Sequence, residues 1–266
     1  MSKALYGNRT LLVTNMTADK PNITDLRLVL VALFSAISLA AMFLLDPIPQ
    51  DLSYHAFADS RSLLGIPNSL NVLSNIPFLL VGVYGLYSLA NIERSKWHPA
   101  WVVLFIGVLL VGFGSSFYHL SPNSGSLVWD RLPMTVGFMG LFVALLSEFS
   151  GLKLGSVSLA SAVTIGIGSV VYWAVADDLR FYAWVQFMPL AVVVILLLTY
   201  SSRFTHSWLL GLALVFYIVA KLAEHFDSTI YSTLGQSMSG HAFKHLFAAA
   251  GCYILLLFLK GRKPQQ

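Results

Sequence analysis

Eight long apolar segments alternate with short polar ones along the chain. They cover about residues 28–45, 68–90, 99–119, 131–148, 155–176, 182–200, 207–226 and 240–259. About 20 apolar residues are enough for a helix to cross the hydrocarbon core of a bilayer. Backbone amides in lipid must be paired, and the period-two alternation of a membrane barrel is absent. The pattern therefore predicts an all-α membrane protein with eight crossings.

The first apolar segment is set apart from the others. A polar tail, residues 1–27, precedes it, and a loop, residues 46–67, separates it from the remaining seven. We interpret it as an additional N-terminal transmembrane helix, which with its loop fills residues 28–67, in front of a seven-helix transmembrane bundle over residues 68–259 and a short tail, residues 260–266. A cleaved signal peptide is the alternative, but the long polar lead and the lack of a small-x-small site after Leu45 disfavour it.

Composition excludes several classes of protein. Hydrophobic residues make up 57% of the chain and charged residues 11%, against about 25% charged residues in soluble domains. The net charge is +4, but the basic residues form no stripe that could follow a phosphate backbone, so we expect no nucleic-acid partner. The single cysteine, Cys252, excludes an internal disulfide or a thiolate cluster. A metal site would therefore use His, Asp and Glu.

The distribution of Lys and Arg predicts the orientation. The connections on the side of both termini hold eleven of these residues, and those on the other side hold three. Both tails, 1–27 and 260–266, are therefore expected to be cytoplasmic, and the loop 46–67 non-cytoplasmic. Three Asn-x-Thr glycosylation patterns in the first tail would favour the opposite orientation, but such triplets are common by chance. They begin at Asn8, Asn15 and Asn22.

Ionisable side chains gather on the non-cytoplasmic side. Eight of the twelve acidic residues and five of the seven histidines fall in its loops or the adjoining helix ends. Such groups are costly near lipid unless they are paired or bind a metal, so they predict a site in this leaflet, with plain interfacial solvation as the alternative. The residues are Asp46, Asp51, Asp59, Asp130, Asp177, Asp178, Glu224, Asp227, His55, His119, His225, His241 and His245.

Two short motifs fall at this depth of the membrane. Ser115 and His119 are four residues apart and share a helix face, as do His241 and His245. Two imidazoles one turn apart can bind one zinc ion, and a third from a neighbouring helix leaves a fourth position for water. Asp130, in the segment Trp-Asp-Arg-Leu-Pro-Met, faces the same leaflet. Taken alone, Asp130 would be interpreted as a helix-capping or first-turn carboxylate.

These residues resemble a known family, the alkaline ceramidases. They belong to a wider group of seven-helix membrane hydrolases that includes the adiponectin receptors. The resemblance runs from about Asn68 to Leu259 and leaves the first helix outside. The matching residues, in the family's order, are the segment 71–78 (Asn-Val-Leu-Ser-Asn-Ile-Pro-Phe), Ser115-x-x-x-His119, Asp130 with Leu132-Pro133-Met134, and His241-x-x-x-His245.

The resemblance implies a zinc ion held by His119, His241 and His245. It makes Asp130 the base that takes the proton of a water molecule, and Ser115 a donor to that water or to the developing oxyanion. A helix serine bonded to the preceding turn is the alternative for Ser115. The implied substrate is a ceramide-like lipid in the membrane, whose linear amide is cut to a fatty acid and a long-chain base.

Two other classes of function remain open from the sequence. One is hydrolysis of an ester or another N-acyl lipid, and the other is a metal-binding receptor or transporter without turnover. The cytoplasmic half of the chain is nearly bare of ionisable residues, with Glu148 at its edge, which favours the enzyme. The pattern favours no particular acyl length or oligomeric state.

The chain also departs from the family. Members that respond to calcium carry an acidic cluster before the first core helix, with a glutamate where this chain has Asn68. Here the segment holds Asp59 and Arg61, so a calcium site like the family's is not expected, because Ca²⁺ favours several carboxylate oxygens. We expect Arg61 to neutralise Asp59 or to meet an anionic lipid. Arg131 stands where the family usually has an acid, which is expected to change the preferred head group.

The remaining polar groups are interpreted as ion pairs at loop ends or as residues that position substrate. They form two clusters. The two lysines that fall inside helices lie beside acids or histidines, and this disfavours the alternative that a buried lysine carries retinal as a Schiff base. The residues are Asp177, Asp178 and Arg180; Glu224, His225 and Asp227; and Lys221 and Lys244.

Overall fold

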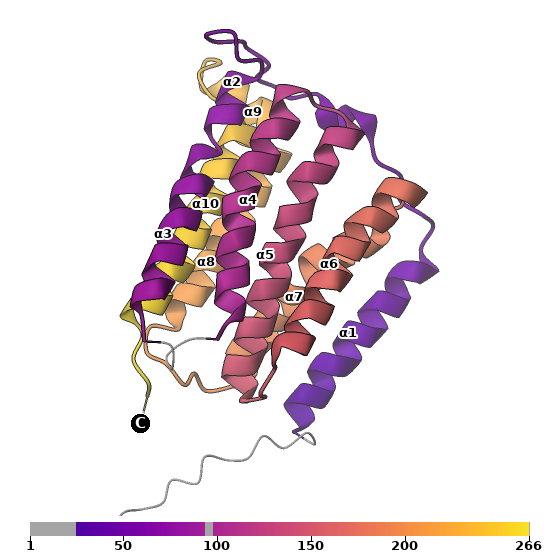
Figure 1. Cartoon of the computed structure of the whole chain (residues 1–266). Helices are drawn as coiled ribbons and strands as arrows, with labels where there is room; N and C mark the ends of the chain where they lie inside the picture. The colour runs from indigo at the N-terminus through magenta and orange to yellow at the C-terminus, as the bar shows by residue number, and fades with distance from the viewer. Residues whose placement is uncertain (1–24, 94–97, 266) are drawn as a thin grey trace, which may run out of the picture.

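The computed structural model describes residues 25–93 and 98–265, which form a helical bundle (Figure 1). The glycosylation patterns of the N-terminal tail lie outside the described residues. The helices are α1 (Leu26–Leu44), η1 (Leu52–His55), α2 (Ser69–Leu73), α3 (Ile76–Asn91), α4 (Ala100–Leu120), α5 (Ser124–Ser150), α6 (Ser156–Ala176), α7 (Arg180–Thr199), α8 (Trp208–His225), α9 (Asp227–Thr233) and α10 (Gly240–Gly261).

Eight segments in the described part of the chain are long and apolar enough to cross a membrane. They coincide with the eight apolar runs, and the prediction of an all-α membrane protein is confirmed. One span joins α2 and α3, which are separated by a break at Ser74 and Asn75. Pro77 has no amide hydrogen to donate to the carbonyl of Leu73, which favours a break in the helix there.

Helix α5 begins earlier than its apolar run. The Asn123 side chain accepts a hydrogen bond from the Ser126 amide, and the Ser126 hydroxyl accepts one from the Asn123 amide. This capping box starts the helix in polar sequence. Asp130 therefore lies in the second turn, buried, and it is neither a cap nor a first-turn carboxylate. The expectation that Asp130 stands at the helix start is wrong for this reason.

Glycines bring α4 and α5 close together. A Cβ added to Gly107 would lie 2.6 Å from the Gly137 nitrogen, and one added to Gly114 would lie 2.0 Å from the Trp129 carbonyl oxygen. Small residues allow two helix backbones to approach to this degree in membranes. The contact holds the last turns of α4 against the turn of α5 that carries Asp130.

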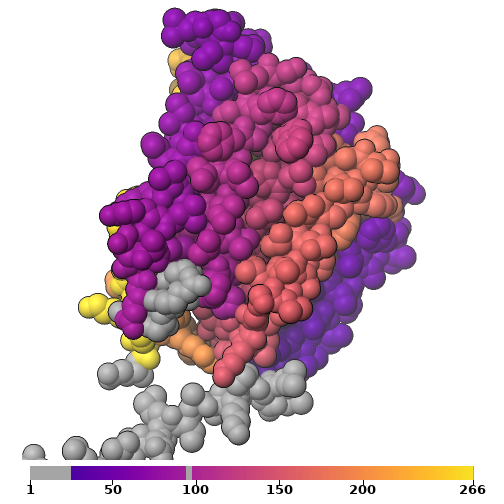
Figure 2. Space-filling view, viewed as in Figure 1, coloured from indigo at the N-terminus to yellow at the C-terminus, as the bar shows by residue number. Residues whose placement is uncertain are grey.

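Helix α1 lies at the outer edge of the bundle, away from α3 and α4 (Figure 2). Only Val31 of this helix is buried, and its main neighbour is α7. The Trp184 indole donates to the Ser38 hydroxyl at 3.0 Å, and Arg180 donates to backbone carbonyls at the end of α1. α1 is therefore an addition to the side of the other seven spans.

The two ends of the bundle differ in polarity. The loops that follow α1, α4, α6 and α8 lie at one end, together with α2 and α9, and the C-terminus lies at the other (Figure 1). At the C-terminal end, Arg262 pairs with Glu148 at 2.6 Å, and the Trp101 indole donates to the same carboxylate. The histidines of both sequence motifs lie at the opposite end.

Candidate metal centre

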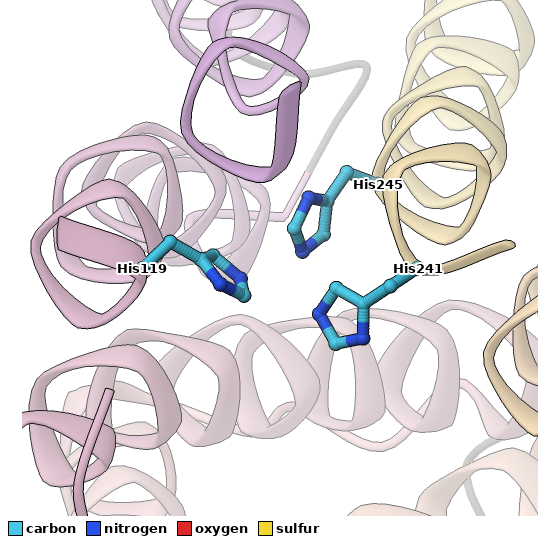
Figure 3. Close-up of side chains that lie close together, drawn as sticks. All are labelled: His119, His241 and His245. Atoms are coloured by element: carbon cyan, nitrogen blue, oxygen red, sulfur yellow. The ribbon is translucent and has the colours of Figure 1, made fainter. Parts of the chain in front are cut away.

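Three histidines converge at the loop-rich end of the bundle. His119 lies in the last turn of α4, and His241 and His245 lie in the first two turns of α10 (Figure 3). Their ring centroids are 4.9 to 5.0 Å apart. One nitrogen from each ring lies within 4.8 Å of the others. The structure therefore brings together, from distant parts of the chain, the three imidazoles that the sequence motifs pointed to.

The ring nitrogens of this cluster fit a metal ion. All three side chains are buried, and neither ring nitrogen of His119, nor Nε2 of His241, has a hydrogen-bond partner among the described residues. An unpaired buried nitrogen costs free energy, which a coordinated cation removes. Three imidazole nitrogens are a donor set that suits zinc, with a position left open.

His245 is oriented by a hydrogen-bonded chain. The Ser74 hydroxyl lies 2.7 Å from His245 Nδ1 and donates to the Asn71 carbonyl at 3.1 Å. Because the serine has a single proton and gives it to the carbonyl, its oxygen accepts from Nδ1–H of the imidazole. This tautomer leaves the Nε2 lone pair for a metal ion.

His241 is positioned by the start of α10. Ser239 caps the helix by accepting from the Ala242 amide, and Asp227 accepts from the His241 amide at 2.7 Å. The other carboxylate oxygen of Asp227 accepts from the Ala58 amide at 2.9 Å. One carboxylate therefore connects the first turn of α10 to the loop between α1 and α2, which was not foreseen in the sequence.

That loop covers the histidines. The Phe57 ring lies 4.7 Å from the ring of His119 and 4.6 Å from that of His241, centroid to centroid. His55 bonds to the Tyr118 hydroxyl through Nδ1 at 2.9 Å and does not join the metal cluster. Burial, together with the nearby Arg131 charge, lowers the pKa of His55 below its ordinary value.

Two cavities reach this centre, one lined by His245 and the other by His241. One cavity is narrow and almost wholly apolar; Ser115, Asp130 and His245 line it at one end, and Leu104 and Leu255 line it further down the bundle. The second is wider, with a volume of about 900 Å³, and is more polar. We refer to the first as the apolar cavity and to the second as the polar cavity. Asp130 lines both cavities, so a molecule that occupied both would pass this carboxyl group.

A charged network beside Asp130 was missed in the sequence. Lys244 and Lys221 each lie 2.5 Å from a carboxylate oxygen of Glu224, and the Tyr54 hydroxyl donates to the same carboxylate at 3.0 Å. Lys244 lines both cavities together with Asp130. The sequence contained one indication of this network. Lys244 lies between the two histidines of the motif, inside an apolar span, where a charged side chain requires a partner.

The loop before the core helices is held by its own charges. Arg61 pairs with Asp59 at 2.7 Å, as expected from the sequence, and its guanidinium holds the pKa of that carboxyl below the ordinary value. The Asn71 side chain donates to the Asp59 carbonyl. The Asn68 side chain donates to the His119 carbonyl at 2.9 Å and so supports the end of α4.

The acidic pair between α6 and α7 anchors the chain that leaves α1. Asp178 pairs with Arg180 at 2.7 Å, and this guanidinium holds the pKa of Asp178 well below its ordinary value. Asp177 accepts from the Gln50 amide at 3.0 Å. The Leu179 amide donates to the Ile48 carbonyl at 2.8 Å. These residues form loop-end contacts, which is one of the two interpretations that the sequence allowed.

A comparison with known protein families finds one that matches most of the chain. A family model described as Ceramidase matches residues 65–263, which is more than half of the chain. The match contains Ser115, Asp130 and the three histidines, and it begins after α1, near the end of the loop that covers the site. No curated protein matches the chain.

Proposed function

The chain belongs to the ceramidase family, and from this premise we propose that it is a membrane-embedded, zinc-dependent hydrolase that cuts the linear amide of a ceramide-like lipid. The products are a fatty acid and a long-chain base. The observation that supports this proposal best is the cluster of three buried imidazoles, with unpartnered nitrogens, beside a buried carboxyl group at the junction of two cavities.

His119, His241 and His245 would hold the metal ion. When bound, zinc supplies a Lewis acid that polarises the amide carbonyl and lowers the pKa of a water molecule. His245 contributes Nε2, because Ser74 engages its other nitrogen. Phe57 reduces the contact of two of the imidazoles with bulk water.

Asp130 would act as the general base. It accepts the proton of the attacking water and returns it to the amine that leaves, so one carboxylate serves both steps. The Asp130 carboxyl interacts with the hydroxyl of Ser115. That hydroxyl can instead donate to the developing oxyanion, a contribution of about 3 to 4 kcal/mol where single donors have been removed from other enzymes.

The cavities suit the two parts of such a lipid. The apolar cavity follows α10 from His245 to Leu255, a rise of about 15 Å at 1.5 Å per residue. Its walls can receive an acyl chain, which places the amide near Ser115 and Asp130. The polar cavity then receives the head group. The active site lies in the non-cytoplasmic leaflet, with both termini in the cytoplasm, in accord with the count of Lys and Arg.

A metal-binding receptor or transporter is the second candidate. Transport requires ionisable groups along a path through both leaflets. In the described part of the chain, the cavity that extends from the metal centre toward the C-terminal end is lined by apolar side chains beyond Asp130 and Lys244. Glu148 lies at that far end, where it pairs with Arg262 and accepts from the Trp101 indole. This arrangement favours an enzyme that opens toward one side.

The experiment measures bound metal and lipid hydrolysis on the same purified proteins. We expect His241→Ala and His245→Ala to lose zinc and activity, and Asp130→Asn to keep zinc but lose turnover, measured by mass spectrometry of the released fatty acid. His206→Asn, at the opposite end and at a positive φ of 64° that asparagine tolerates, is the control and should keep both. Full activity in a metal-free His241→Ala protein would refute the proposal.

A further inference from the structure

Arg131 is a buried cation that forms no ion pair with the carboxylates of the described residues. It follows Asp130 in α5 and is 6% exposed. Within residues 25–93 and 98–265, no group forms an ion pair or a hydrogen bond with it, and its Nη1 atom is buried without a partner. A buried guanidinium without hydrogen bonds is costly, because its five N–H donors lose water. The side chain therefore has unused binding capacity.

Three aromatic rings surround the guanidinium. Its carbon atom lies 4.0 Å from the ring centroid of Trp173, 4.7 Å from that of Tyr182 and 5.8 Å from that of Tyr54. Cation–π contacts of this kind stabilise the charge. They supply no oxygen acceptor to the N–H donors of the group. The rings come from three different elements, so the orientation does not depend on one flexible loop.

The guanidinium lies on the wall of the polar cavity that also reaches Asp130 and His241. The other two cations of this wall, Lys221 and Lys244, are both engaged by Glu224.

The carboxylates of the wall are Asp51, Asp130, Glu224 and Asp227. Asp51 accepts from the amide and the hydroxyl of Ser53, and Asp227 accepts from two backbone amides. Asp130 lies close enough to interact electrostatically with Arg131, but among the described residues no carboxylate of the wall forms an ion pair or a hydrogen bond with this guanidinium.

We propose that Arg131 binds an oxyanion on the head group of the substrate, so that the enzyme prefers an N-acyl lipid with a phosphate, sulfonate or carboxylate head. This inference rests on the proposed function, and it adds the class of head group. A guanidinium forms two parallel hydrogen bonds with such a group, and the low-dielectric cavity strengthens them. Arg131 and Asp130 line the same cavity, so one lipid can contact both.

The test compares two lipids that share one acyl chain, ceramide and ceramide 1-phosphate, in mixed micelles. We expect wild type to show a kcat/KM at least tenfold higher for the phosphate. Arg131→Met should reduce the ratio of the two kcat/KM values at least tenfold, chiefly through KM for the phosphate, and Arg131→Glu should reduce it further. Arg131→Lys should keep part of the preference, since it retains the charge without the planar donors.

A structural role for Arg131 predicts a different result, because a damaged fold lowers hydrolysis of both lipids in parallel. Arg61→Met is the matched control. Arg61 is an exposed arginine at the same end of the bundle, paired with Asp59 and outside the cavity wall. Its substitution should leave the ratio as in wild type. An unchanged ratio in Arg131→Met, or a wild-type preference for neutral ceramide, would overturn the inference.

A binding measurement separates this inference from the proposed function. Ceramide 1-phosphate is titrated into Asp130→Asn and into Asp130→Asn/Arg131→Met, and at least tenfold weaker binding to the second protein supports the inference even if wild type hydrolyses neither lipid. Equal binding to both proteins overturns it. Inorganic phosphate is then added as a competitor. If it binds as tightly as the lipid, in an Arg131-dependent way, the site takes a free anion and the head-group assignment is wrong.

Discussion

Ser74 provides a sharp test of how the metal centre is built, because it acts only through His245. Its hydroxyl is buried, lies 2.7 Å from His245 Nδ1 and donates to the Asn71 carbonyl. Ser74→Ala removes one oxygen atom and leaves Nδ1–H without its acceptor. The imidazole is then free to rotate and to change its tautomer, and its Nε2 lone pair is no longer directed at the ion.

The size of the effect can be taken from other proteins in which a similar hydrogen bond orients a metal-binding histidine. Removal of such a bond typically weakens metal binding about 10- to 100-fold, which corresponds to about 1.4 to 2.7 kcal/mol. We therefore expect the zinc affinity of Ser74→Ala to be about 10- to 100-fold lower than that of wild type. Hydrolysis should recover toward the wild-type rate when zinc is added in excess, because the residue does not touch the reacting atoms.

The assay is a zinc titration of the metal-free protein against a chelating indicator, followed by hydrolysis rates across zinc concentrations. Ser116→Ala is the matched control. Its hydroxyl donates to the Gly112 carbonyl of its own helix at 2.7 Å and does not contact a histidine. Wild-type zinc affinity in Ser74→Ala, or an equal loss in Ser116→Ala, would show that the hydrogen-bonded chain does not orient His245.

Two further outcomes test packing and charge. Gly114→Ala places a methyl group 2.0 Å from the Trp129 carbonyl oxygen and should lower stability by about 1 to 3 kcal/mol, seen as a lower Tm in detergent. Gly168→Ala meets no atom within 4 Å and should keep or raise Tm; equal Tm values for the two would contradict the close approach. Because Arg180 lowers the pKa of Asp178 from 3.8, the pair stabilises fully above about pH 4 and loses that contribution as the pH falls further. Asp178→Asn should thus lower Tm at pH 7 by an amount that shrinks below pH 4, and a constant difference would disprove the linkage.

The sequence predicts the number and positions of the membrane spans, because lipid imposes one simple rule on the composition of each helix. It does not predict where helices begin in polar sequence. The start of α5 depends on the capping box of Asn123 and Ser126, which hydropathy does not register. The break before α3 depends on Pro77, and it places Ser74 against His245.

The candidate metal ligands could be predicted because two of them form a helical pair and the third recurs in a family motif. The groups around them could not. Lys244 and Glu224 meet across two helices, and their partnership depends on the packing of α8 against α10, for which the sequence offers no period. Asp227 shows the same limit, since it stabilises backbone amides and these carry no residue-specific signal.

The junction at Asp130 has a consequence for how a reaction would end. Under the proposed function, the acyl fragment would be left in a cavity with almost wholly apolar walls, so its exit into the bilayer would gain almost no transfer free energy. The polar fragment would face the wider opening instead. We therefore expect the fatty acid to leave more slowly than the polar fragment, and turnover to fall when free fatty acid is added to the membrane.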